Sequence, residues 1–144
     1  MSSVSFIIPV FNKAKYIKTV IKSLKNQDGD YKKEFIFVDD GSTDNSLEII
    51  KDETKNLKNC KIISQENKGS ANATNIGIKQ AKMKYIKFLD ADDILIANAT
   101  LALLNILEEN SDFILAYGLQ RKVKDIHSVK LNEKFDSNDI TFFY

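Results

Sequence analysis

The chain has 144 residues, of which 43% are hydrophobic, 28% charged and 10% aromatic. These proportions exclude collagen-like and generally disordered chains, and the length suffices for a domain with a buried core. Because 21 Lys and Arg face 20 Asp and Glu, the net charge is only +1, so no strong overall field attracts nucleic acid or anionic lipid.

Four short apolar segments predict buried strands at residues 4–8, 35–38, 61–64 and 85–89. Between and after them, apolar residues recur every three or four positions, which predicts helices near residues 14–24, 47–57, 73–81 and 101–107. A fifth strand is predicted at residues 113–117. This alternation is typical of a mainly parallel sheet with helices on both faces, an α/β/α sandwich.

The alternating pattern stops at Gly118. Beyond it, polar and apolar residues mix, and only residues 122–124 and 128–131 suggest short strands. The first residues lack the basic stretch of a signal peptide, and no apolar run approaches the roughly 20 residues of a membrane helix. We expect one domain over residues 1–118, an incomplete continuation or tail over 119–144, and a cytoplasmic protein, free or peripheral at a membrane, without a transmembrane segment.

Ligands of open parallel sheets bind at the carboxyl ends of the strands. Carboxylates cluster there twice in this sequence, as Asp39 and Asp40 after the second strand and as Asp90, Asp92 and Asp93 after the fourth. Five acids at one edge of a sheet repel one another unless a cation or a polar ligand offsets their charge.

The triplet Asp90-Ala91-Asp92 indicates a metal site. Alternate residues at the end of a strand point the same way, and hard carboxylate oxygens suit Mg²⁺ or Mn²⁺. The single arginine of the chain, Arg121, strengthens this interpretation, because bidentate arginine contacts to phosphate are almost unavailable. The alternative is that Asp92 or Asp93 caps the next helix, or that the run is a solvated turn.

The run after the second strand also has two interpretations. Asp and Gly favour a tight turn, and Ser42, Thr43 or Asp44 can cap the following helix. Asp39, the last residue of the strand, can instead accept a hydrogen bond from a base N–H or a ribose hydroxyl. After the third strand, small residues from Gly69 onward allow a ligand to approach the backbone closely.

Together these segments resemble the family 2 glycosyltransferases, which have the GT-A fold. The resemblance covers about residues 3–118 and rests on VSFIIPVFN at 4–12, FVDDGSTD at 37–44, NKG at 67–69 with NIG at 75–77, and FLDADD at 88–93. Each motif is weak singly, but the four in this order and spacing are specific. The resemblance implies a Rossmann-like GT-A fold.

In that family the residues matching positions 9–11 line the base pocket, and the residue matching Asp39 hydrogen-bonds the base, typically uracil. Asp90 and Asp92 match the DxD motif, in which the first carboxylate helps hold ribose or sugar and the second binds a metal that bridges the diphosphate. The implied nucleotide-sugar-binding residues are Pro9, Val10, Phe11, Asn12, Asp39, Asp40, Gly41, Lys68, Gly69, Asn75, Asp90 and Ala91, and the implied metal ligands are Asp90 and Asp92.

The resemblance implies an inverting transferase of polysaccharide biosynthesis. Its donor is a nucleotide sugar, with UDP as the expected nucleotide, and its acceptor is a hydroxyl of a glycan, a lipid-linked saccharide or another molecule. A divalent Mn²⁺ or Mg²⁺ acts as a Lewis acid on the departing nucleoside diphosphate, and a carboxylate base assists the attacking hydroxyl. No nucleic-acid partner is expected, and nothing in the sequence indicates an oligomeric state.

Two features depart from the family pattern. Many relatives have Arg where this chain has Thr74, and Lys68 is the candidate substitute for its contact to the donor. The catalytic base of the family comes from a later segment, which nothing in residues 119–144 matches. The sequence therefore suggests a truncated donor-binding portion with an unidentified base, although three acids are available in this stretch: Asp125, Asp136 and Asp139.

Three alternatives remain at this point. A domain that binds a nucleotide sugar without transferring it would need no base. A nucleotidyltransferase would carry a Gly-rich loop with a basic residue directly after the first strand, where this chain has Pro9-Val10-Phe11-Asn12. A receiver-like signalling domain would place its acid pair after the first strand, whereas here the pair follows the second.

Overall fold

The computed structural model describes residues 1–118, 120–132 and 134. Four strands form one all-parallel sheet in the order β3-β2-β1-β4. The described elements are β1 Ser3–Val10, α1 Ala14–Lys25, β2 Lys32–Asp39, α2 Ser46–Thr54, β3 Cys60–Ser64, α3 Ser70–Gln80, β4 Tyr85–Phe88, α4 Ala99–Glu109 and the 3₁₀ helix η1 Ile126–Ser128.

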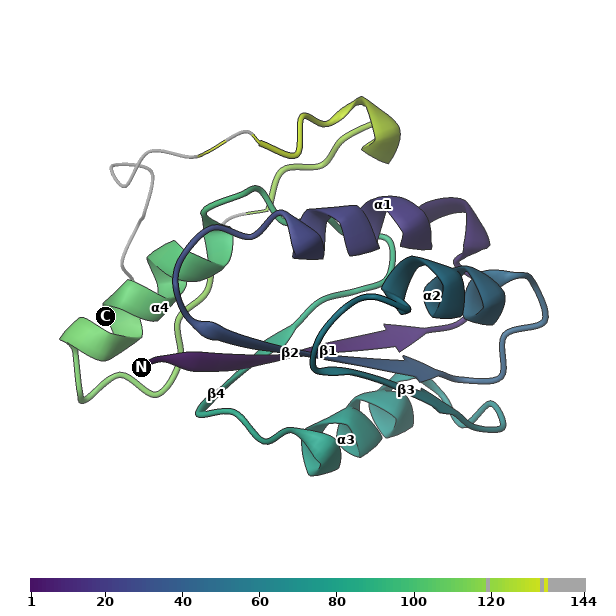
Figure 1. The fold of residues 1–144 in the computed structure, drawn as a ribbon, viewed down its shortest axis with the longest axis horizontal. Coiled ribbons are helices and arrows are strands. Elements are labelled where there is room, and N and C mark those ends of the chain that lie inside the picture. Colours follow the sequence, from purple (N-terminus) through teal and green to yellow (C-terminus); the bar gives the residue numbers. More distant parts are fainter. Residues whose placement is uncertain (119, 133, 135–144) are drawn as a thin grey trace.

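Helices cover the sheet on both faces, as the sequence predicts: α1 and α2 lie on one face and α3 on the other (Figure 1). The apolar positions of α1 form a continuous stripe, because Ile17, Val20, Ile21 and Leu24 recur every three or four residues and are all fully buried. They pack with the side chains that β1 directs toward this face, such as Phe6. No helix in the described ranges is long and apolar enough to cross a membrane.

On the opposite face, α3 lies unusually close to the central strand. A Cβ placed on Gly77 would come within 2.4 Å of the Ile7 Cγ2 atom, so only glycine permits this approach. A second, smaller apolar cluster forms beneath α3 around Ile36, Val38 and Ala73, all of which are buried. The start of α3 is thereby held over the carboxyl ends of β1 and β2.

The predicted fifth strand is wrong: residues 113–118 are irregular, and Ile114 and Leu115 are 99% and 74% exposed. A strand needs a neighbour for its backbone hydrogen bonds, and no described strand pairs with this segment. Among the strands of the described residues, β4 therefore lies at the edge of the sheet, with Ile86 and Phe88 exposed. The short strands suggested at residues 122–124 and 128–131 are also wrong, because that stretch is irregular around η1.

Candidate functional site

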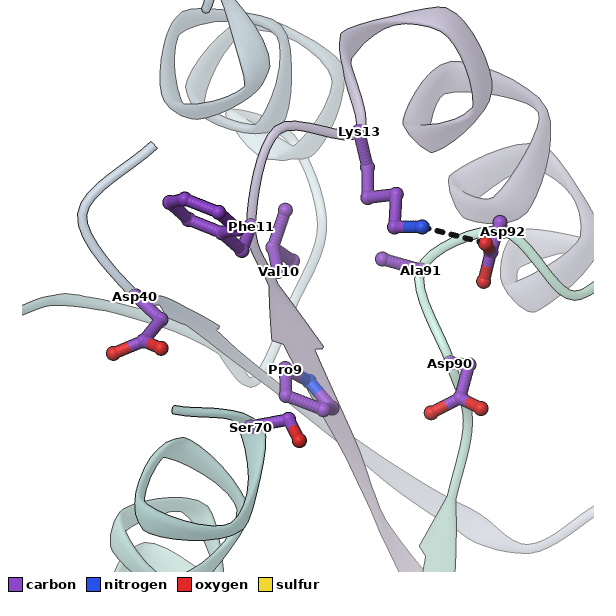
Figure 2. Close-up of a pocket in the computed structure, with 9 residues that line it drawn as sticks. All are labelled: Pro9, Val10, Phe11, Lys13, Asp40, Ser70, Asp90, Ala91 and Asp92. Atoms are coloured by element: carbon purple, nitrogen blue, oxygen red, sulfur yellow. Dashed lines mark hydrogen bonds and ion pairs between the residues drawn. The ribbon is translucent and has the colours of Figure 1, made fainter. Parts of the chain in front are cut away.

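A cavity of about 400 Å³ opens at the carboxyl edge of the sheet. Figure 2 shows Asp40 on one side, Asp90 and Asp92 on the other, and Pro9 of the central strand between them. Seven predicted residues line the cavity, together with Lys13 and Ser70, which were not predicted as site residues. The full lining is Pro9, Val10, Phe11, Lys13, Asp40, Ser70, Asp90, Ala91 and Asp92.

Asn12 shapes the loop between β1 and α1 without lining the cavity. It adopts a left-handed backbone conformation with φ 52°, which Asn tolerates better than most residues. Its Oδ1 accepts hydrogen bonds from the backbone N–H of Thr43 (2.8 Å) and Asp44 (3.3 Å), and its own N–H donates to Ser42 Oγ (3.0 Å). Asn12 therefore ties the loop after β1 to the loop after β2.

A second set of bonds fixes the start of α1. The backbone N–H of Lys13 donates to the buried Ser46 Oγ (2.8 Å), and that of Ala14 donates to Asp44 Oδ2 (3.0 Å). Asp44 Oδ1 also accepts from the Ser46 N–H (2.9 Å) in the first turn of α2, although the N-cap position is held by Asn45 and not by Ser42, Thr43 or Asp44 as predicted. Burial raises the pKa of Asp44, but the hydrogen bonds from Ser46 and Ala14 outweigh it, and the pKa lies below its ordinary value.

Asp39 ends β2 and is buried, with 2% of its surface exposed. Its Oδ1 accepts from the Ser42 N–H (3.3 Å) and its Oδ2 from Ser64 Oγ (3.1 Å). The carboxylate thus lies beside the end of β3 and does not line the cavity. Its predicted contact with a base stays a prediction.

Asp40 is equally buried and is the anchor of the loop that precedes α3. Its carboxylate accepts from Gln65 Nε2 (2.6 Å) and from the backbone N–H groups of Lys68 (2.8 Å) and Gly69 (2.9 Å). Burial raises the pKa of Asp40, but these three hydrogen bonds together bring it below the ordinary value. The ionised carboxylate therefore holds the loop at the rim of the cavity.

Gly41 allows this loop to lie against the turn after β2. Its φ is +72°, and a Cβ there would come within 2.9 Å of the Asn67 backbone N. Gly41 and Gly69 thus act through backbone geometry and do not line the cavity.

The loop after β4 carries the clustered acids. Asp90, Asp92 and Asp93 are exposed, and the Asp93 N–H donates to the Asp90 carbonyl (3.0 Å) in a turn. This turn begins nine residues before α4, whose N-cap position is held by Asn98, so none of the three acids caps that helix. Partial desolvation of the Asp93 carboxyl, followed by repulsion from Asp90 and Asp92, raises its pKa above the ordinary value. The three carboxylates therefore share a region of negative potential.

Lys13 crosses the cavity to this loop. Its Nζ lies 2.6 Å from Asp92 Oδ2, the contact drawn as a dashed line in Figure 2. Lys13 was not predicted, because the motif that follows the first strand in the sequence ends at Asn12. Ser70 lines the cavity as the first residue of α3, directly after Gly69 at the N-cap position.

The donor set at this edge fits a divalent cation that takes part of its coordination from a ligand. Asp90 and Asp92 both present carboxylate oxygens to the cavity. Among the described residues, no three His, Cys, Asp or Glu side chains lie close enough to hold a metal by themselves. Mg²⁺-type sites of this kind use one or two carboxylates, with waters and substrate phosphates completing the shell.

The remaining candidates lie away from the cavity. Lys68 and Asn75 are exposed, and Lys68 reaches the site through its backbone bond to Asp40. Among the available acids, Asp125 accepts from the His127 N–H (3.0 Å) at η1, and its side chain does not line the cavity. Asp136 and Asp139 lie outside the described residues.

Comparison with known proteins places this geometry among glycosyltransferases. The model of a family described as Glycosyl transferase family 2 matches residues 5–142. The chain is 35% identical over 158 aligned residues to the poly(ribitol-phosphate) beta-N-acetylglucosaminyltransferase TarP of Staphylococcus aureus, covering 100% of this chain and 46% of TarP. The chain spans between 18% and 46% of the length of the curated relatives it matches.

Solved structures of glycosyltransferases share the fold. S. aureus TarS 1–349 in complex with UDP superposes with a TM-score of 0.67 at 31% identity, covering 76% of this chain and 32% of that chain. The same TarS fragment has also been solved with UDP-GlcNAc. The mannosyltransferase PcManGT of Pyrobaculum calidifontis, in complex with GDP-Man and Mn²⁺, superposes with a TM-score of 0.62 at 27% identity, covering 68% of this chain and 30% of that chain.

Proposed function

Because this chain belongs to glycosyl transferase family 2, we propose that it binds a UDP-sugar and a divalent cation in the cavity at the carboxyl edge of its sheet. The proposed reaction is transfer of the sugar to an acceptor hydroxyl with inversion at the anomeric carbon. The observation that carries the proposal is the placement of Phe11 and the Asp90–Asp92 carboxylates around one cavity. The UDP, UDP-GlcNAc and Mn²⁺ complexes of structural relatives support it.

The proposed roles follow from the two sides of the cavity. Phe11 is 44% exposed at the rim, where its ring can stack on a base, a contact that contributes about 1–3 kcal/mol in other nucleotide sites. Asp39 would accept from the base N–H at the end of β2. Asp90 would hold ribose or sugar hydroxyls, and Asp92 with Asp90 would hold the cation.

A cation bound there supplies Lewis-acid stabilisation to the departing diphosphate. That role suits a chain with a single arginine, because bidentate arginine contacts to phosphate are almost unavailable. The protein side chains then have three tasks: to orient the base, to hold the hydroxyls of the donor and to position the phosphates.

The acceptor site and the catalytic base belong, on this proposal, to the part of the relatives that this chain does not match. Of the three carboxylates lining the cavity, Asp40 is engaged by three hydrogen bonds and Asp90 and Asp92 are assigned to the donor and cation. This leaves no free carboxylate among the lining residues, which favours a second candidate: a domain that binds the donor without transferring its sugar. A transfer assay on the chain distinguishes the two functions.

Calorimetry with UDP, with and without Mn²⁺, tests the proposal. We expect UDP to bind about tenfold more tightly with Mn²⁺, a difference of about 1.4 kcal/mol. Asp92→Ala should remove this enhancement and leave the unfolding transition intact, because Asp92 is exposed. Asp112→Ala, at an exposed site outside the cavity, is the control. Absence of UDP binding in both conditions would overturn the proposal.

A further inference from the structure

We propose that Lys13 couples the binding of the cation to the binding of the donor. In the absence of ligands its ammonium group neutralises Asp92; when donor and cation enter, it leaves Asp92 and contacts the diphosphate. The inference rests on the function proposed above and adds a specific task for a residue outside the matching motifs. In this scheme Lys13 binds the diphosphate of the donor and takes no part in bond breaking.

The backbone of Lys13 is held in place at the mouth of the cavity. Its N–H donates to the buried Ser46 Oγ (2.8 Å), and its carbonyl accepts from the N–H groups of Tyr16 (2.8 Å) and Ile17 (2.9 Å) in the first turn of α1. The preceding residue, Asn12, is fixed by its bonds to the loop after β2. The side chain therefore starts from a rigid point beside the cavity.

The ammonium end has both a partner and freedom to move. Lys13 Nζ lies 2.6 Å from Asp92 Oδ2, and the side chains remain 33% exposed for Lys13 and 42% exposed for Asp92. An exposed ion pair of this kind changes the equilibrium constant between its paired and unpaired states by at most about fivefold, so the ammonium can exchange this partner for another. A lysine side chain with four methylene groups can move its charge several ångströms without moving the backbone.

The charges in the cavity make the exchange favourable. Lys13 is the one cationic side chain among the nine residues that line it, against the carboxylates of Asp40, Asp90 and Asp92. A divalent cation on Asp92 repels the ammonium from the same carboxylate. The diphosphate of the donor brings two or more negative charges to the same cavity and offers the ammonium a new partner.

Because of this competition, the affinity for the cation and the affinity for the donor depend on each other. Without the donor, Lys13 lowers the affinity for the cation because both bind Asp92. With the donor present, the diphosphate draws Lys13 away and the cation meets a free carboxylate. By thermodynamic linkage, the factor by which UDP improves cation binding equals the factor by which the cation improves UDP binding.

The test is a titration of Mn²⁺ into the protein, without and with saturating UDP, followed by the electron paramagnetic resonance of free Mn²⁺. Lys13→Met should raise the Mn²⁺ affinity of the ligand-free protein about fivefold, because the competing ammonium is gone. With UDP bound, its Mn²⁺ affinity should be equal to or below that of the wild type. The enhancement by UDP should therefore fall at least about fivefold.

Two variants control for charge and for shape. Lys15→Met removes the same charge two positions away, at an exposed residue of α1 outside the cavity lining, and should leave both Mn²⁺ affinities unchanged. Lys13→Arg keeps the positive charge and should restore most of the enhancement. Urea unfolding should show Lys13→Met folded, because Ser46 binds the backbone of Lys13 and not its side chain.

The outcomes separate this inference from the function on which it rests. Wild-type protein that binds UDP and Mn²⁺ with an enhancement that Lys13→Met leaves unchanged overturns the inference alone. An equal change in Lys15→Met also overturns it, because the effect would then be a general one of net charge. Wild-type protein that binds no UDP overturns the proposed function, and this inference with it.

Discussion

The two sides of the cavity are built in different ways. On one side, the side-chain oxygens of Asn12, Asp40 and Asp44 accept hydrogen bonds that cross-link the loops after β1, β2 and β3. Asn12 and Asp44 are exposed to solvent, whereas Asp40 is buried. We call these three loops the cross-linked side. On the other, the loop after β4 leaves an edge strand and presents Asp90 and Asp92 to the cavity; we call it the acidic side. The Lys13–Asp92 ion pair joins the two sides across the cavity.

This difference separates what the fold determines from what a ligand must supply. The cross-linked side satisfies its own polar groups, so its geometry is set before a ligand arrives. The acidic side keeps like charges close together, and a cation would relieve that repulsion. Donor recognition on the cross-linked side should therefore be largely preorganised, whereas the acidic side should change its charge state when ligands bind.

The largest expected effect comes from removing the charge of Asp40. Asp40→Asn replaces one accepting oxygen by an NH₂ group that faces the N–H donors of Gln65, Lys68 or Gly69, so at least one buried donor loses its partner. We expect the free energy of unfolding to fall by about 2–3 kcal/mol. Urea denaturation measures it. The matched change on the acidic side, Asp93→Asn, should leave stability unchanged or slightly higher, because Asp93 is exposed and repelled by its neighbours.

The same pair predicts opposite signs in the pH dependence of stability. The folded-state pKa of Asp40 lies below its ordinary value of 3.8, so its contribution is complete above that pH and is lost as the pH falls through the folded-state pKa. The pKa of Asp93 lies above 3.8, so its protonation favours the folded state and stability gains as the pH falls toward 3.8. Subtracting the pH profile of the unfolding free energy of each variant, Asp40→Asn or Asp93→Asn, from that of the wild type isolates the contribution of each carboxyl. Equal difference profiles would show that the two sides of the cavity do not differ.

The next largest effect concerns ligand binding on the cross-linked side. Phe11→Ala should weaken UDP binding about tenfold, because the ring that we propose stacks on the base is lost. The loss should be the same with and without Mn²⁺, and uridine without phosphates should show it too. Calorimetry with both ligands measures it, and Phe88→Ala on the exposed edge strand is the control. A loss confined to the Mn²⁺ condition would mean that Phe11 acts on the acidic side instead.

The sequence predicts the strands and helices that carry the cross-linked side well, because the apolar patterns that indicate them are local. Buried runs such as residues 35–38 indicate strands flanked by helices, and the structure confirms the parallel sheet with helices on both faces. The prediction of the fifth strand fails because strand pairing is not a local property. Residues 113–117 have the composition of a strand, but a strand forms only beside a partner, and sequence periodicity does not report whether one is present.

Within the site, too, local signals in the sequence are informative and contacts between distant loops are not foreseen. The sheet brings to one cavity three residues that directly follow its strands: Phe11, Asp90 and Asp92. The roles of Asp40 and Lys13 depend on contacts between loops that are distant in sequence: Asp40 reaches residues 65, 68 and 69, and Lys13 reaches Asp92. Only the folded arrangement of the loops reveals these contacts.

The smallest effect tests how Lys13 is held between the two sides. In Ser46→Ala the Lys13 N–H loses its acceptor, and Asp44 loses the hydroxyl that donates to it. Because Ser46 is fully buried, water replaces these bonds poorly, and we expect unfolding to become easier by about 1 kcal/mol. Urea denaturation measures this change, with Ser70→Ala, at an exposed position, as the control. Mn²⁺ titration of the same variant should show a UDP enhancement between those of the wild type and Lys13→Met, because a loosened backbone positions the ammonium less well on Asp92. Full enhancement despite the loss of stability would show that the side chain of Lys13 finds Asp92 without help from the cross-linked side.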